Sequence, residues 1–195
     1  MLNSEPTIVL YKSLTCGHCD DLSKIWDTPP PGGNISVMDA LKRINPKIRF
    51  SVVTAKDQDG RFDEKLYPSD LIRYGGRFPT ILLIPGNLWD AAMAKLGPKN
   101  DVKLINGVQI MNAKWENNIL RRHNKYNIMN PEDYSEWLIE CQNEEAFRKV
   151  QSDLSSFIIT DRLNNFVVST KPSSSLITCD NNVCSLKLMP RRNKY

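Results

Sequence analysis

The feature that most constrains the fold is an apolar, β-branched run that leads directly into a pair of cysteines. Residues Thr7–Ser13 read Thr-Ile-Val-Leu-Tyr-Lys-Ser, which is the pattern of a buried strand. Thr15 then offers a hydroxyl group as N-cap, and this predicts a helix over residues 16–26. We therefore expect the cysteines to lie where a strand runs into the amino end of a helix.

Further elements follow from hydrophobic periodicity and from breakers, of which Pro-Pro-Pro-Gly-Gly at 29–33 is the strongest. The predicted strands cover 48–55 and 81–84, and the predicted helices cover 36–44, 68–74, 88–96 and 131–150. A hairpin is expected over 102–110, centred on Asn106-Gly107. Together these elements predict an α/β protein with a mixed sheet flanked by helices.

Some side chains are expected in the core. Trp89, Trp115 and Trp137 fall on or near predicted helices at core-like spacing. Cys141 lies on the apolar stripe of the 131–150 helix, so we expect a buried and inert thiol. His123, among cations, is expected at the surface.

The character of the chain changes after residue 150. Residues 152–195 hold eight serines, and 171–175 read Lys-Pro-Ser-Ser-Ser, a linker composition. We expect a domain over 1–150 and a C-terminal extension over 151–195 that is partly disordered or docks on the domain or on a partner.

Charge and hydropathy exclude several functions. The 26 basic and 22 acidic residues leave a net charge of +4, too small and dispersed to indicate nucleic acid binding. No apolar run is long enough for a membrane span, and the polar N-terminus lacks the regions of a signal peptide. We expect a cytoplasmic protein, and cysteine pairs there are usually catalytic, sensory or metal-binding. The 18 asparagines suit an AT-rich genome such as that of a large DNA virus, so packaging in a virion is considered.

The tetrapeptide Cys16-Gly17-His18-Cys19 suits thiol–disulfide exchange. At a helix N-terminus, unpaired N–H groups and the helix dipole favour a negative charge, so Cys16 is the expected thiolate nucleophile. Cys19 lies one turn on, where it can resolve a mixed disulfide. Gly17 is expected to permit the tight turn and leave access to the sulfur. His18 is expected to stabilise the thiolate electrostatically.

Other roles for the cysteines stay open at this stage. Zinc could use Cys16, His18 and Cys19, although ligands at this spacing rarely close a tetrahedral site. Alternatively, Cys179 and Cys184 could join the two motif cysteines to give four thiolate ligands. The motif cysteines could also be incidental. In the extension, Cys179 and Cys184 could form a small disulfide, could act as a secondary redox pair that relays electrons to the first, or could have no role.

The motif resembles the active site of the protein disulfide isomerase family, which has the same Cys-Gly-His-Cys sequence and shares the following Leu22 and Trp26. Phe78-Pro79-Thr80 before an apolar strand resembles the cis-proline loop of the thioredoxin superfamily. The resemblance, over about residues 7–100, implies a thioredoxin-like fold. In it, Cys16 would be the thiol that attacks the substrate disulfide and Cys19 the thiol that resolves the mixed disulfide. His18 would tune the Cys16 thiolate, and Pro79 would be the cis-proline. It also implies that the loop around Pro79, with Phe78 and Thr80, and Gly17 contact substrate.

The sequence departs from that family at three supporting positions. Thr15 replaces a tryptophan before the first cysteine, Leu10 replaces a buried acid six residues before it, and Lys24 replaces the helix proline. The approach to the motif looks closer to glutaredoxins. These departures put isomerase efficiency in doubt more than dithiol chemistry.

The sequence therefore predicts a thiol–disulfide oxidoreductase that exchanges disulfides with protein substrates. Its partners would be protein thiols and an unidentified redox protein or glutathione. No metal is expected, because ligands at the spacing of the motif rarely close a tetrahedral site. No phosphate-bearing or flavin cofactor is expected, because no glycine-rich loop follows a strand. The alternative is a thioredoxin-like structural or scaffold protein with weak or vestigial redox activity, such as a virion component.

Overall fold

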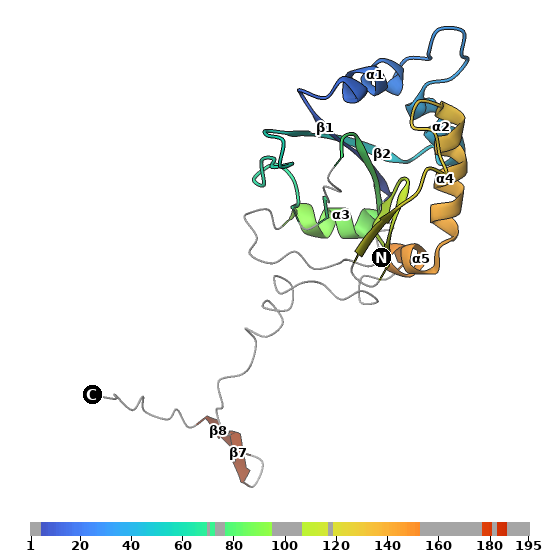
Figure 1. The fold of residues 1–195 in the computed structure, drawn as a ribbon. Helices are drawn as coiled ribbons and strands as arrows, with labels where there is room; N and C mark the ends of the chain where they lie inside the picture. Colours follow the sequence, from blue (N-terminus) through green and yellow to red (C-terminus); the bar gives the residue numbers. More distant parts are fainter. Residues whose placement is uncertain are drawn as a thin grey trace. The chain divides into compact units, whose positions relative to one another are not determined.

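The predicted first strand lies inside a mixed sheet in the computed structural model of the protein (Figure 1). The structure describes residues 5–69, 71–72, 77–94, 107–116, 119–152, 177–180 and 183–186. The chain divides into two compact units, Met1–Thr160 and Asp161–Tyr195. The cysteine motif belongs to the first.

The first unit contains a six-stranded sheet in the order β2-β1-β3-β4-β5-β6. The β1–β2 pair is parallel and the other pairs are antiparallel. The strands are β1 (Thr7–Ser13), β2 (Arg49–Ala55), β3 (Thr80–Ile84), β4 (Gln109–Ile110), β5 (Ala113–Glu116) and β6 (Ile119–Arg122).

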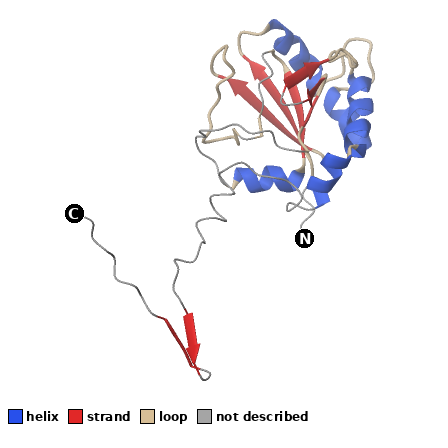
Figure 2. Cartoon of the chain, turned by 60° about the horizontal axis from the view of Figure 1, so that its bottom comes forward, coloured by secondary structure: helices blue, strands red, loops and turns tan. Residues whose placement is uncertain are grey.

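Among the described residues, five helices accompany this sheet. Figure 2 colours the helices blue. They are α1 (Gly17–Trp26), α2 (Val37–Ile44), α3 (Gly86–Met93), α4 (Pro131–Asn143) and α5 (Glu145–Ser152). The α/β class, with a mixed sheet flanked by helices, is therefore confirmed. No helix among the described residues is long and apolar enough to cross a membrane.

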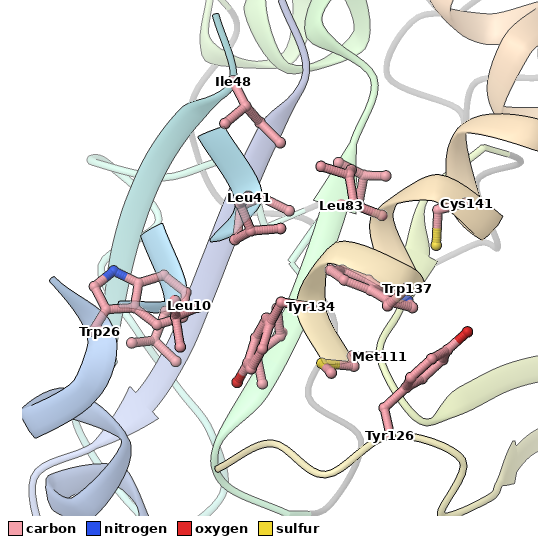
Figure 3. Packing of buried hydrophobic residues seen from close by; sticks show 14 of the residues in the cluster. Leu10, Trp26, Leu41, Ile48, Leu83, Met111, Tyr126, Tyr134, Trp137 and Cys141 are labelled. Carbon is pink, nitrogen blue, oxygen red and sulfur yellow. The ribbon is translucent and has the colours of Figure 1, made fainter. Parts of the chain in front are cut away.

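Residues of β1 alternate between two apolar clusters, one on each face of the sheet. Ile8 and Leu10 contribute to the first cluster, and Val9 and Tyr11 to the second. A strand buried on both faces reads as a continuous apolar run, which is why β1 was predictable. Figure 3 shows the first cluster, in which Trp26 of α1, Leu41 of α2, and Tyr134, Trp137 and Cys141 of α4 pack over the sheet.

Local capping signals explain where α2 and α4 begin. The Ser36 hydroxyl accepts a hydrogen bond from Asp39 N at 3.1 Å, which caps α2. Asn130 caps α4, and Pro131 stands at its first position. The two helices pack together, and the Ser135 hydroxyl donates to the Ala40 carbonyl at 3.0 Å.

The described hairpins and turns differ from several expectations. The pairing closest to the expected 102–110 hairpin joins β4 and β5 around Met111-Asn112, with Ile110 opposite Ala113, and residues 101–106 lie outside the described residues. Asn112 adopts a φ of 58°, a conformation that asparagine tolerates. In the segment expected to be a helix over 68–74, Leu71 N and Ile72 N donate to the Pro68 carbonyl, and residues 70 and 73–74 are not described.

Two helix expectations and one core expectation need correction. The 131–150 helix is broken at Glu144, whose backbone is extended, so α4 and α5 are separate. Trp89 and Trp137 are buried as expected, but Trp115 lies on β5 and is 37% exposed. Helix α3 begins two residues before the expected 88–96 helix, and residues beyond Ala94 are not described.

The second unit contains an antiparallel pair of strands, β7 (Ile177–Asp180) and β8 (Val183–Leu186). Their register places Cys179 opposite Cys184.

Candidate active site

The site begins where β1 ends. Ser13 closes the strand, and Cys16 N donates to the Ser13 carbonyl at 3.4 Å. Cys16 is the N-cap of α1, and its carbonyl accepts hydrogen bonds from Cys19 N at 2.9 Å and Asp20 N at 3.2 Å. The expectation that Thr15 caps this helix is wrong, because Thr15 instead pairs with Ser13 through its hydroxyl and its N–H.

The two cysteines of the motif are free thiols in different surroundings. Cys16 is partly exposed, whereas Cys19 is 1% exposed. Burial, together with a hydrogen bond to the Cys16 sulfur, raises the pKa of Cys19 from 9.0 to about 12. The pair thus combines an accessible sulfur at a helix N-terminus with a protonated thiol one turn further on.

A short hydrogen-bond chain ties α1 to β1 beneath the motif. The Ser23 hydroxyl donates to the Cys19 carbonyl at 2.7 Å, and Lys12 Nζ donates to the Ser23 hydroxyl oxygen at 3.3 Å. Nothing in the sequence pattern pairs Lys12 with Ser23. These two hydrogen bonds hold the second turn of α1 against β1, the strand that precedes the motif.

The supporting position six residues before Cys16 is fully apolar. Leu10 is 2% exposed and belongs to the same cluster as Leu22 and Trp26 of α1 (Figure 3). This position therefore brings no carboxylate to the buried thiol of Cys19. What it does provide is apolar packing that holds the helix on the sheet.

The strand register brings Pro79 to the same end of the sheet as the motif. β1 and β3 run antiparallel, with Tyr11 opposite Thr80, so the start of β3 lies beside the end of β1. The Phe78–Pro79 peptide bond is cis, as predicted. Thr80 is buried, and its hydroxyl donates to the Arg77 carbonyl at 2.8 Å. The Thr80 side chain is thus engaged within its own loop.

An aromatic group that the sequence analysis missed supports this loop. The Tyr11 ring meets Phe78 edge to face at 5.4 Å between centroids, and meets Phe62 in the same way at 5.5 Å. Phe62 also contacts Tyr67, whose hydroxyl donates to the Val52 carbonyl on β2 at 3.1 Å. The segment after β2 therefore packs against the loop that precedes β3, and the Phe78 ring is held within the protein.

Gly17 and His18 occupy the exposed side of the motif. A Cβ at Gly17 would meet nothing within 4 Å, and its φ is not in the left-handed region. The backbone conformation at Gly17 therefore does not itself need glycine, and the missing side chain leaves the approach to Cys16 open. His18 is exposed, and its charge acts on Asp21, whose pKa is lowered mainly by the hydrogen bond from Lys24.

The sequence analysis also missed an exposed leucine beside Cys16. Leu14 stands two residues before Cys16 and is 77% exposed. It follows the last residue of β1, at the end of the sheet where Pro79 lies. Its signal in the sequence was an apolar residue in the loop between the strand and the motif.

The remaining cysteines are Cys141 in the first unit and a pair in the second. Cys141 is 4% exposed within the first apolar cluster, and burial raises its pKa, in agreement with an inert thiol. Cys179 and Cys184 belong to the second unit. Among the described residues, no group of three or more histidine, cysteine or carboxylate side chains could hold a metal ion.

The fold and this site together define an α/β protein with a dithiol at the amino end of a helix. Comparison with known proteins finds no matching family model and no significant match to a curated protein or a solved structure. The function is therefore argued from the site itself.

Proposed function

We propose that the protein is a thiol–disulfide oxidoreductase that exchanges disulfides with protein substrates through Cys16 and Cys19. The observation that carries the proposal is the asymmetry of the pair. Cys16 is partly exposed and caps a helix, whereas the Cys19 thiol is buried one turn away. Catalytic dithiols need this division, because one sulfur must meet the substrate and the other must wait.

The reaction follows in two balanced exchanges. The Cys16 thiolate attacks one sulfur of a substrate disulfide, and the substrate S–S bond breaks as a Cys16–substrate disulfide forms. The released substrate thiolate takes a proton. Cys19 then loses its proton and attacks the Cys16 sulfur, which releases the second substrate thiolate and leaves a Cys16–Cys19 disulfide. Two electrons pass to the substrate, and oxidation of a substrate dithiol follows the same steps in reverse.

The surroundings of Cys16 support a protein substrate. Gly17 leaves open space, Leu14 offers an exposed apolar side chain, and the loop around Pro79 lies at the same end of the sheet. An extended substrate segment beside Cys16 would meet backbone groups of that loop, while the Phe78 ring stays packed on Tyr11. The cis Phe78–Pro79 bond agrees with the thioredoxin-like loop that the sequence resembles.

Reduction of insulin, with dithiothreitol as the electron donor, tests the proposal. We expect the native protein to accelerate precipitation of the insulin B chain, and Cys16→Ser to leave only the rate of dithiothreitol alone. Cys141→Ala is the matched control, since it removes a buried thiol outside the site. Equal rates for the native protein and Cys16→Ser would refute the proposed function.

A further inference from the structure

The C-terminal unit places two cysteines directly opposite each other in an antiparallel pair of strands. β7 and β8 (labelled in Figure 1) pair so that Cys179 stands opposite Cys184, with Thr178 opposite Ser185 next to them. The sequence between the strands is Asn181-Asn182. This juxtaposition is a property of the backbone register and not of sequence spacing alone.

The register suits a disulfide. Opposed residues of an antiparallel pair have Cα atoms about 4.5–5.5 Å apart. A disulfide joins Cα atoms about 4.4–6.8 Å apart, so the pair lies within its range. Opposed residues also share one face of the sheet, whereas the next residue along a strand belongs to the other face. Cys179 and Cys184 therefore share a face, and position 185 lies on the opposite one.

The described part of this unit gives a reason for a crosslink. Its strands form a two-stranded sheet, and an isolated two-stranded hairpin is marginally stable in water. A covalent link between the strands would limit the conformations of the unfolded hairpin and so favour the paired state.

We infer that Cys179 and Cys184 form a reversible cross-strand disulfide, a second thiol–disulfide site that stabilises the β7–β8 hairpin when oxidised. The oxidant is a low-molecular-weight disulfide such as glutathione disulfide. One cysteine thiolate attacks it, forms a mixed disulfide and releases a glutathione thiolate, which takes a proton. The other cysteine then attacks the mixed disulfide and releases the second glutathione. This site does not depend on the function proposed for Cys16 and Cys19.

The test equilibrates the full-length protein over a series of reduced-to-oxidised glutathione ratios, followed by alkylation, trypsin digestion and mass spectrometry. Trypsin leaves both cysteines in one peptide, between Arg162 and Lys187, because Lys171 precedes proline. The closed disulfide is read as the loss of two hydrogen masses and of both alkyl groups. The motif cysteines fall in another peptide and do not affect the reading.

Register variants supply matched controls. Cys184→Ser with Ser185→Cys moves one thiol to the opposite face while it lengthens the separation by a single residue. Adding Thr178→Cys and Cys179→Thr restores an opposed pair, at 178 and 185.

We expect the equilibrium constant for closing the disulfide to be at least about tenfold larger for the native and restored pairs than for the off-register pair. This ratio corresponds to a difference of about 30 mV in reduction potential. Equal constants for all three would overturn the inference, because closure would then follow from sequence separation alone. A native pair that stays reduced, or carries glutathione on both cysteines, at every ratio would overturn it too.

Discussion

The Cys19 thiol is buried one helical turn after Cys16, which is partly exposed at the N-cap of α1, and burial together with the Cys16 side chain raises the pKa of Cys19. Because the two cysteines differ in exposure, we expect their thiol–disulfide exchange reactions to differ in rate and in pH dependence. The accessible sulfur meets substrate directly. The buried one must first give up a proton that its surroundings hold.

The resolving step should depend strongly on pH. Burial and the Cys16 contact raise the pKa of Cys19 to about 12, so its thiolate is scarce near neutrality. Below that pKa the thiolate fraction rises about tenfold for each pH unit, and we expect the resolution rate to rise in parallel. The decay of a preformed mixed disulfide on Cys16, followed by rapid mixing and acid quench, measures this rate. A rate that levels off below pH 9.0, the ordinary thiol value, would contradict the burial of Cys19 in the working protein.

The contact between Lys12 and Ser23 should couple the stability of β1 to that of α1. Lys12 Nζ donates to the Ser23 hydroxyl oxygen, which in turn donates to the Cys19 carbonyl. Lys12→Met and Ser23→Ala are each expected to lower the free energy of unfolding. Because both remove the same hydrogen bond, we expect a coupling energy of about 0.5–1 kcal/mol between the two substitutions. A double-mutant cycle in urea measures the coupling. A coupling indistinguishable from zero would show that the hydrogen bond adds nothing to stability.

Leu14 should contribute to protein substrates and not to small ones. Its side chain is 77% exposed two residues before Cys16. We expect Leu14→Ser to raise KM for insulin several-fold, because the loss of one apolar contact costs about 1 kcal/mol of binding free energy. The rate with a small aromatic disulfide should not change. Ile139→Ser is the control, since Ile139 is an exposed apolar residue, at 47%, on α4, which carries none of the site. Equal effects of both substitutions would place Leu14 outside the substrate contact.

Raising the pH should destabilise the reduced protein. Burial raises the pKa values of Cys19, Cys141 and Tyr134, which favours their protonated forms in the folded state. For Cys19 this stabilisation is complete below the unfolded value of 9.0 and is lost as the pH rises through about 12. Urea midpoints of the reduced protein should therefore fall as the pH increases above 9.0. The fall should be smaller in Cys141→Ala, and a constant midpoint would contradict the prediction.

Gly107 should be intolerant of a side chain. Its φ is +91°, and a Cβ there would come within 3.0 Å of the Val150 side chain on α5. We expect Gly107→Ala to cost about 1–3 kcal/mol of unfolding free energy. Gly32 has a φ of +77° with nothing within 4 Å, so Gly32→Ala reports the backbone cost alone. If the two variants lose the same stability, the contact with Val150 is unimportant.

Elements with strong local signals were predictable from the sequence. β1 is apolar throughout because both of its faces are covered, and α2 follows a serine cap with an apolar stripe of Val37 and Leu41. The cysteine motif was placed at the amino end of a helix because its strand and breaker signals are local. The resemblance also gave the cis bond before Pro79.

Other features could not be predicted because they depend on tertiary contacts. β6 is an edge strand of the sheet, β5 lies next to it, and both are largely exposed, so their apolar and polar residues do not alternate cleanly. The prediction that Trp115 lies in the core is therefore wrong. The break at Glu144 has no proline or glycine to announce it. The contacts of Tyr11 with Phe62 and Phe78 join segments that are far apart in the chain.

The most direct test of the account is a single turnover of the reduced protein with an excess of a disulfide-bonded peptide, quenched with acid and read by mass spectrometry. The account predicts that Cys19→Ser accumulates one peptide on Cys16. The native protein should instead end as a Cys16–Cys19 disulfide with one peptide disulfide reduced. A Cys19→Ser protein that carries no peptide on Cys16, or a Cys16→Ser protein that still reduces the peptide at the native rate, would contradict it.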